Sequence, residues 1–168
     1  MADDRPDLTP DPAADLSRLY EADILAWSEQ QAAALRSHPV DLGLLDWNNL
    51  AEEIEDVGKS AIRACRSQVD NILTHLLKIE FLGPDEVVPH WKGEIVGFRA
   101  SLADELTPTI ERQVRERLGA QLSTAVSRLE VAGRLSVADA VYAKLRGYTW
   151  AQIVDDDWWP TLGQPAVV

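Results

Sequence analysis

Residues 46–82 read DWNNLAEEIEDVGKSAIRACRSQVDNILTHLLKIEFL and contain no proline. Apolar side chains recur in this stretch at gaps of three and four residues, which is the period of an amphipathic helix. They are Leu50, Ile54, Val57, Ala61, Cys65, Val69, Ile72 and Leu76. Asp46 can cap the beginning of this helix, and Gly83-Pro84 ends it. The stretch predicts one long helix whose apolar stripe must be covered by other helices.

The same spacing predicts further helices on both sides of this stretch. The expected ranges are 15–36, 89–106, 108–133, 136–147 and a last turn or two from Trp150. Suitable capping residues precede them: Asp15, Thr107, Ser136 and Thr149. His38-Pro39 is expected to stop the helix over 15–36.

No segment shows sustained alternation of apolar and polar residues, so we expect no sheet. Short connections between helices favour antiparallel neighbours. The sequence therefore predicts an all-α fold, an antiparallel up-and-down four-helix bundle with a short C-terminal helical appendage. We expect a disordered leader over residues 1–12, a single domain over 13–162 and a loose tail over 163–168.

The net charge of −12 is unevenly distributed. Residues 1–60 carry 14 acidic and 4 basic side chains, whereas residues 61–168 carry 14 acidic and 12 basic ones. A surface of this sign repels phosphate backbones and anionic lipids, so we expect neither nucleic-acid binding nor membrane binding.

The first residues lack the basic and apolar regions of a signal peptide, and no apolar run is long enough to span a bilayer. These features favour a cytoplasmic location. Cys65 is the only cysteine, and its place on the apolar stripe predicts a small core residue.

Several stretches in this order along residues 19–160 resemble a bacterial family, domain of unknown function 29. The residues that carry the resemblance are Leu19–Asp23 with Trp27, Gln31 and Leu35, then Leu45–Gly58, His75–Lys78, Trp91 with Ile95 and Arg99, and Tyr148–Val154 with Asp157, Trp159 and Pro160. The chain departs from the family at Ile79, where members often have an aromatic residue. The resemblance implies an all-helical bacterial protein and implies no activity.

Four acidic residues gather at the beginning of the long helix: Glu52, Glu53, Glu55 and Asp56. Acidic side chains in a first turn oppose the positive end of the helix dipole, so a structural role is expected. At least one carboxylate should lie at a helix–helix seam and need a basic partner there. The candidates for this partner are Arg63, Arg66 and Arg99.

Histidines and carboxylates inside a helical bundle can also ligate a divalent metal. The weak candidates for such a site are His75, His90, Glu94 and Glu53. The Glu-x-x-His spacing of di-iron bundles is missing, and about 20 residues of helix would separate His75 from the acidic cluster by about 30 Å. A metal-dependent helical-bundle enzyme is therefore the alternative interpretation.

No phosphate-binding glycine loop and no Gly-x-Ser-x-Gly motif is present. Trp158 and Trp159 either cover the end of the bundle or form an aromatic interaction patch. Arg112 and Arg115, with Arg117, form a basic cluster that either is a solvated face or docks the acidic half of a second copy. The leading expectation is a non-catalytic helical protein, without a cofactor, that acts through contacts with a protein partner or a second copy.

Overall fold

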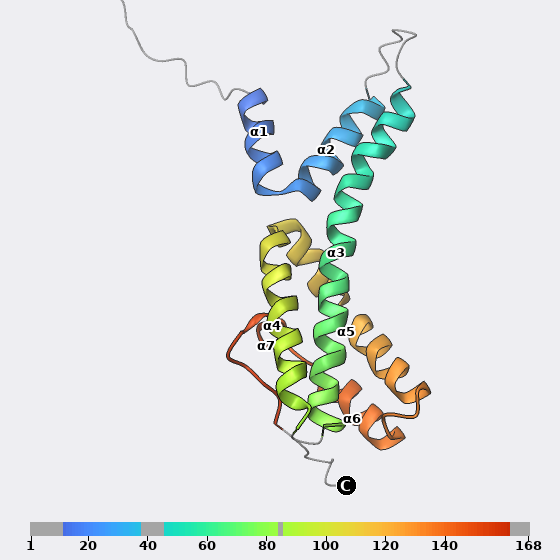
Figure 1. The fold of residues 1–168 in the computed structure, drawn as a ribbon. Coiled ribbons are helices and arrows are strands. Elements are labelled where there is room, and N and C mark those ends of the chain that lie inside the picture. The colour runs from blue at the N-terminus through green and yellow to red at the C-terminus, as the bar shows by residue number, and fades with distance from the viewer. Residues whose placement is uncertain (1–11, 38–45, 84–85, 162–168) are drawn as a thin grey trace, which may run out of the picture. The chain divides into compact units, whose positions relative to one another are not determined.

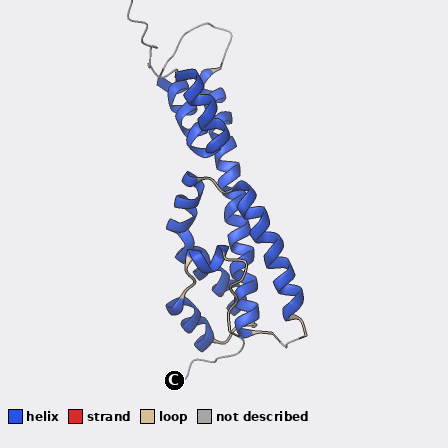
Figure 2. Ribbon diagram, turned by 90° about the vertical axis from the view of Figure 1, so that its left-hand side faces the viewer, coloured by secondary structure: helices blue, strands red, loops and turns tan. Residues whose placement is uncertain are grey.

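The computed structural model describes residues 12–37, 46–83 and 86–161, and all of its regular structure there is helical (Figures 1 and 2). The elements are α1 (Pro12–Ala22), α2 (Ile24–Ser37), α3 (Trp47–Phe81), α4 (Val88–Glu105), α5 (Pro108–Val131), α6 (Val137–Arg146) and α7 (Trp150–Val154). The all-α prediction is confirmed, whereas the up-and-down four-helix arrangement stays a prediction. No helix in the described ranges has the length and apolar character needed to cross a bilayer.

The chain divides into two compact units, residues 1–60 and 61–168, and we describe each by itself. The expected single domain over 13–162 stays a prediction. The expected leader lies outside the described residues except for Pro12, which is helical, and the expected tail over 163–168 lies outside them entirely. The stop at His38-Pro39 also falls outside them.

The helix expected over 15–36 is two helices, because Asp23 interrupts it. The Asp23 side chain is buried, and its Oδ1 accepts a hydrogen bond of 3.1 Å from the backbone nitrogen of Ala26 at the beginning of α2. This is the geometry of a helix N-cap. Asp15 is not a cap, because α1 begins at Pro12 and Asp15 pairs with Arg18 inside the first turns.

The long helix α3 is continuous, as the sequence predicts, and Asp46 caps it through a 3.1 Å bond from Asn49 N to Oδ1. Of its predicted apolar stripe, Cys65, Val69, Ile72 and Leu76 are buried, but Leu50 and Val57 are exposed. In the first unit, α3 instead turns Ala51 and Gly58 inward, and Gly58 lies against Leu25 and Ser28 of α2. The predicted helical spacing is therefore confirmed, whereas the prediction that Leu50 and Val57 face the core is wrong.

Replacing Gly58 by alanine is expected to lower the free energy of unfolding by about 1–3 kcal/mol, as overpacking of a tight contact does. A Cβ there would overlap Ser28 Oγ and lie 2.8 Å from Leu25 Cδ1. Gly119→Ala on α5 is the matched control, because its Cβ would meet no atom within 4 Å. That variant should gain up to about 1 kcal/mol of helix propensity. Urea denaturation separates the two, and equal effects would contradict the close approach of α2 to α3.

The helices of the second unit follow the predicted caps. Thr107 Oγ1 accepts from Ile110 N at the beginning of α5, and Ser136 Oγ accepts from Asp139 N at the beginning of α6. Thr149 and Gln152 form a complete capping box at α7. Gly147 ends α6 with a φ of 67°, a conformation that glycine adopts without the penalty of a Cβ.

Candidate functional site

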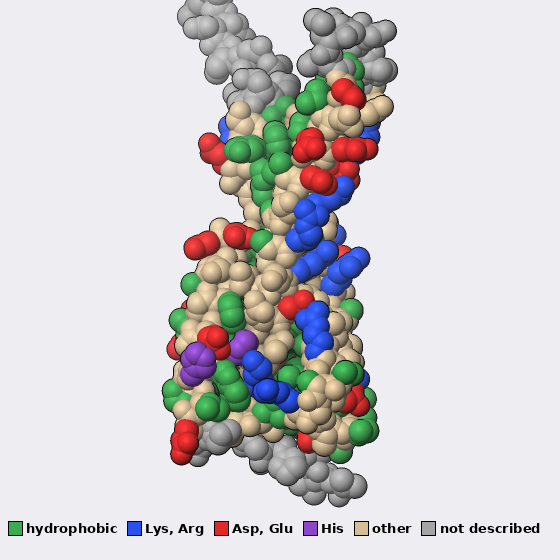
Figure 3. All heavy atoms as spheres, turned by 45° about the vertical axis from the view of Figure 1, so that its right-hand side comes forward, with side chains coloured by type: hydrophobic (Ala, Val, Ile, Leu, Met, Phe, Trp, Pro, Cys, Tyr) green, Lys and Arg blue, Asp and Glu red, His purple; other side chains and the backbone are tan. Residues whose placement is uncertain are grey.

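Three of the four metal candidates meet on the surface of the second unit, where α3 lies beside α4. Glu94 Oε2 is 2.9 Å from Nε2 of His75 and 3.6 Å from Nε2 of His90. Figure 3 shows the two histidine side chains in purple next to an acidic side chain in red. The His75 side chain is mostly buried, whereas that of His90 is 74% exposed. Glu53, the fourth candidate, belongs to the first unit.

Hydrogen bonds to the protein occupy the ring of His75. Its Nδ1 is 2.8 Å from the carbonyl oxygen of Asn71, so this nitrogen carries a proton and donates it. Its Nε2 faces the Glu94 carboxylate and also lies 3.4 Å from Lys78 Nζ. In the described part of the chain, no three His, Cys, Asp or Glu side chains are arranged to hold a metal ion. Metal binding at this cluster stays a prediction from the sequence.

Next to this cluster, Arg99 of α4 connects the carboxyl-terminal segment to the rest of the unit. The side chain is buried, and its Nε donates to Ile153 O at 2.8 Å. Its Nη2 donates to the carbonyl oxygens of Gln152 and Trp158 at 2.9 and 3.2 Å. Burial lowers the pKa of this guanidinium, although the charges of Asp156 and Asp155 act in the opposite direction. Arg99 thus binds the end of α7 and the chain that follows it.

The two tryptophans of this segment, Trp158 and Trp159, are partly exposed. Arg99 Cζ and Lys92 Nζ lie 4.9 and 4.8 Å from the ring centre of Trp159, within the range of cation–π contacts. Trp158 packs edge-to-face on Tyr148. Both residues therefore cover part of the second unit, and their interaction with a partner stays a prediction.

A second buried polar cluster joins α3 to the end of α6. Glu80 is 5% exposed, and its two carboxylate oxygens contact Arg146 Nη1 at 2.7 Å and the Tyr148 hydroxyl at 2.5 Å. Burial raises the pKa of Tyr148 well above its ordinary value, and the negative charge of Glu80 adds to this effect. The phenol therefore keeps its proton and donates it to Glu80. This cluster is fully paired and holds no free nucleophile.

Cys65 is a core residue, as the sequence predicts. Its side chain has no exposed surface, and burial raises the pKa of the thiol to about 11. Because the thiolate is the reactive form, this cysteine is unsuited to nucleophilic catalysis at neutral pH.

The acidic cluster on α3 has a basic partner that the sequence did not predict. Glu55 pairs with Arg36 of α2 at 2.6 Å and with Lys59 at 3.5 Å. Arg99, one of the predicted partners, binds backbone carbonyl oxygens instead, so that prediction is wrong. The hydrogen bond from Arg36 lowers the pKa of Glu55. The partner comes from the helix that precedes α3, which the spacing within α3 could not indicate.

Arg112 and Arg115, for which the sequence predicts either a solvated face or a docking surface, are paired within α5. Arg112 contacts Glu116 at 3.1 Å, and Arg115 contacts Glu111 at 3.2 Å. These pairs join residues four positions apart on an exposed helix face, so they agree with the solvated-face interpretation. Their contact with a second copy stays a prediction.

A model of the family described as "Domain of unknown function DUF29" matches residues 19–159. The chain belongs to the DUF29 family. The resemblance stated from the sequence motifs over residues 19–160 is thereby confirmed. No curated protein matches this DUF29 chain.

A solved structure is similar to this DUF29 chain: the crystal structure of an alpha-helical protein of unknown function from Rhodospirillum rubrum. The two chains are 24% identical and superpose with a TM-score of 0.63, which covers 83% of this chain and 90% of the other. At this identity the likeness supports the helical fold and says nothing of activity.

Sequence reasoning missed an exposed apolar face on α6 of the DUF29 chain. Val137, Val141 and Leu145 are 70%, 53% and 82% exposed. Ala140 and Ala143 are buried on the other side of the same helix. A signal was present, because residues four and eight positions apart share one helix face. The short helix buries small alanines and leaves two valines and a leucine exposed to solvent, which is the reverse of the usual expectation.

Proposed function

We propose that this DUF29 protein is a non-catalytic, cytoplasmic protein that acts through protein–protein contacts. The observation that supports the proposal is the face of α6 formed by Val137, Val141 and Leu145, which we call the α6 stripe. An isolated exposed valine needs no explanation, but apolar side chains gathered on one face are typical of an interaction site. The clusters around Glu80 and Arg99 serve the fold.

The occupant that fits the α6 stripe best is the same stripe of a second copy. Three apolar residues spaced evenly along a helix of 10 residues form a self-complementary surface. In a two-fold pairing of antiparallel helices, Val137 would lie opposite Leu145 of the copy, and Val141 would lie near the axis. Such a surface is small, so we expect a weak dimer.

Leu145→Glu is expected to weaken this dimer by about a hundredfold or more, because the two-fold pairing loses two leucine contacts and gains two buried charges. Sedimentation equilibrium of the full chain over a wide concentration range measures the effect. Val96→Glu is the matched control, because Val96 is 49% exposed and lies on α4, away from the stripe in sequence. A wild-type chain that stays monomeric at millimolar concentration, or equal effects of both variants, would contradict the proposal.

A further inference from the structure

The first helix of the first unit, α1, has an apolar face that the described chain covers incompletely. Leu16, Leu19 and Tyr20 share this face, because residues three and four positions apart lie on one side of a helix. No side chain from position 15 to position 22 is buried, and Tyr20 is 53% exposed. A helix of 11 residues is marginal by itself in water, so it depends on packing that α2 supplies only in part.

Two hollows lie along this face, where α1 meets α2. One encloses about 390 Å³ and is lined by Leu16, Ser17, Tyr20, Glu21 and Trp27. The other encloses about 460 Å³ and is lined by Asp15, Leu16, Leu19 and Gln30. Leu16 borders both, so they form one surface, which we call the α1 groove. Tyr20 and Trp27 pack edge-to-face there with ring centroids 4.8 Å apart, and such aromatic residues concentrate binding energy at interfaces.

The charge around the α1 groove is negative. Residues 1–60 carry 14 acidic and only 4 basic side chains. The basic side chains in the described part of this unit are already paired, Arg18 with Asp15, Arg36 with Glu55, and Lys59 with Asp56. Glu21 borders the groove and forms no ion pair with a described residue. A partner with basic side chains would therefore meet carboxylate charge that the described chain does not neutralise.

These features distinguish between possible occupants. The first unit of a second copy has the same excess of negative charge and would be repelled, as would an anionic lipid surface. An apolar surface with carboxylates at its border instead suits a helix whose apolar face is flanked by lysine or arginine.

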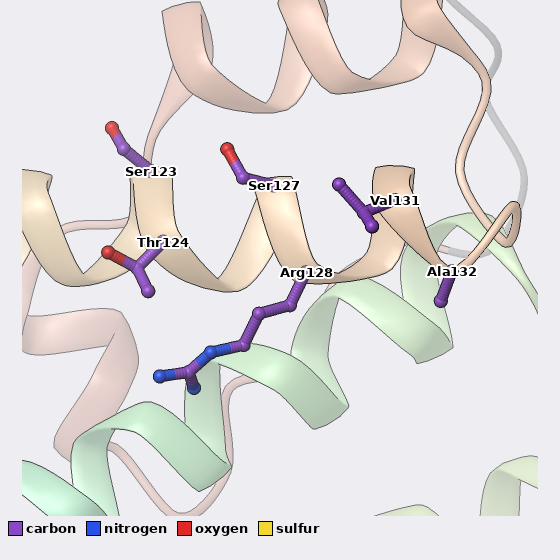
Figure 4. A pocket seen from close by; sticks show the side chains of 6 residues that line it. All are labelled: Ser123, Thr124, Ser127, Arg128, Val131 and Ala132. Atoms are coloured by element: carbon purple, nitrogen blue, oxygen red, sulfur yellow. The ribbon is translucent and has the colours of Figure 1, made fainter.

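A second open hollow, along the second half of α5, provides a comparison (Figure 4). It encloses about 620 Å³ and is lined by Ser123, Thr124, Ser127, Arg128, Val131 and Ala132. This lining contains a cation and no carboxylate, so a basic helix should prefer the α1 groove to the hollow on α5.

We propose that the α1 groove binds a basic amphipathic helix of another protein. The apolar face of that helix would cover Leu16, Leu19 and Tyr20, and its lysine or arginine side chains would face Glu21. This partner is additional to the second copy proposed for the α6 stripe, which belongs to the second unit.

The experiment titrates a fluorescein-labelled peptide with the full chain and measures fluorescence anisotropy. The peptide has about 14 residues of leucine and lysine, with the leucines at gaps of three and four so that they share one helix face. A control peptide has the same composition in an order without this period. We expect the helical peptide to bind about tenfold or more tightly than the control peptide, because only a continuous apolar face can fill the groove.

Tyr20→Ala should weaken binding of the helical peptide about tenfold, because it removes an aromatic contact from the groove. Leu50→Ala is the matched control, because Leu50 is also exposed in the first unit but borders neither hollow. It should bind the peptide as the wild type does. Circular dichroism of both variants checks that the helices are retained.

Glu21→Lys tests the charge without removing an apolar contact. It should weaken binding about fivefold at low salt, and this difference should shrink as salt screens the charges. Glu52→Lys makes the same change of charge at an exposed position of α3 that borders neither hollow, so it should bind as the wild type does.

Hydrogen exchange locates the bound peptide, which should protect amides of α1 and leave residues 123–132 unchanged. Equal binding of the two peptides, equal losses in Tyr20→Ala and Leu50→Ala, or protection of residues 123–132 instead of α1 would overturn the proposal. Self-association that is lost in Tyr20→Ala, without peptide binding, would also overturn it and assign the groove to a second copy. Leu145→Glu leaves the groove intact and should bind the peptide normally, so failure of the dimer proposal is distinguishable from failure of this one.

Discussion

Arg99→Met is expected to lower the free energy of unfolding by about 4 kcal/mol. The substitution removes three hydrogen bonds from a charged donor, each worth about 1.5–3 kcal/mol and not fully additive. It also leaves the carbonyl oxygens of Gln152, Ile153 and Trp158 without the donor that now binds them. Urea denaturation monitored by circular dichroism measures the loss.

The native state of this variant should also change locally. Trp159 loses the guanidinium that stacks on its ring, so tryptophan fluorescence should shift to longer wavelength before global unfolding begins. Hydrogen exchange should be faster from Trp150 to Trp159 than elsewhere. Arg99→Lys should restore little of the lost stability, because an ammonium cannot reproduce the planar arrangement of guanidinium donors. Arg112→Met is the control. If it lowers the free energy of unfolding as much as Arg99→Met does, the role of Arg99 in binding the segment after α7 is contradicted.

The local structure of the chain could largely be predicted from its sequence. Helix spacing and capping residues act over three or four positions, so the continuous α3 and the caps at Thr107, Ser136 and Thr149 follow from short segments. The break at Asp23 was missed because the apolar spacing continues across it. Only the buried side chain that caps α2 distinguishes the two helices from one.

The candidate sites were less predictable because their residues are distant in sequence. Glu94 and His75 were both predicted as candidate metal ligands, and the structure places Glu94 Oε2 2.9 Å from His75 Nε2. Arg99 was expected to pair with a carboxylate, whereas it binds carbonyl oxygens 53 to 59 residues away. Every residue has a backbone carbonyl oxygen, so no sequence motif could indicate which ones Arg99 binds.

Tyr148→Phe is expected to lower the free energy of unfolding by about 2 kcal/mol at pH 7, and this difference from the wild type should disappear above pH 11. The neutral-pH loss is that of a buried hydrogen bond to the charged Glu80. The pH dependence follows from the raised pKa of Tyr148. The unfolded tyrosine loses its proton near pH 10, whereas the folded one keeps it, so the folded state binds more protons above that pH.

Stability therefore declines as the pH rises, by about 1.4 kcal/mol per pH unit for one such group. The phenylalanine variant has no phenol at this position, so its free energy of unfolding does not show that part of the decline. The thiol of Cys65 also makes stability decline as the pH rises, because its pKa is raised from 9.0 to about 11. Cys65→Ala should remove only the decline between those two pH values. Urea denaturation at several values from pH 7 to 11.5 separates the two groups. If the difference between wild type and Tyr148→Phe stays constant to pH 11.5, the phenol does not hold its proton against Glu80, and the buried cluster that joins α3 to α6 is held by Arg146 alone.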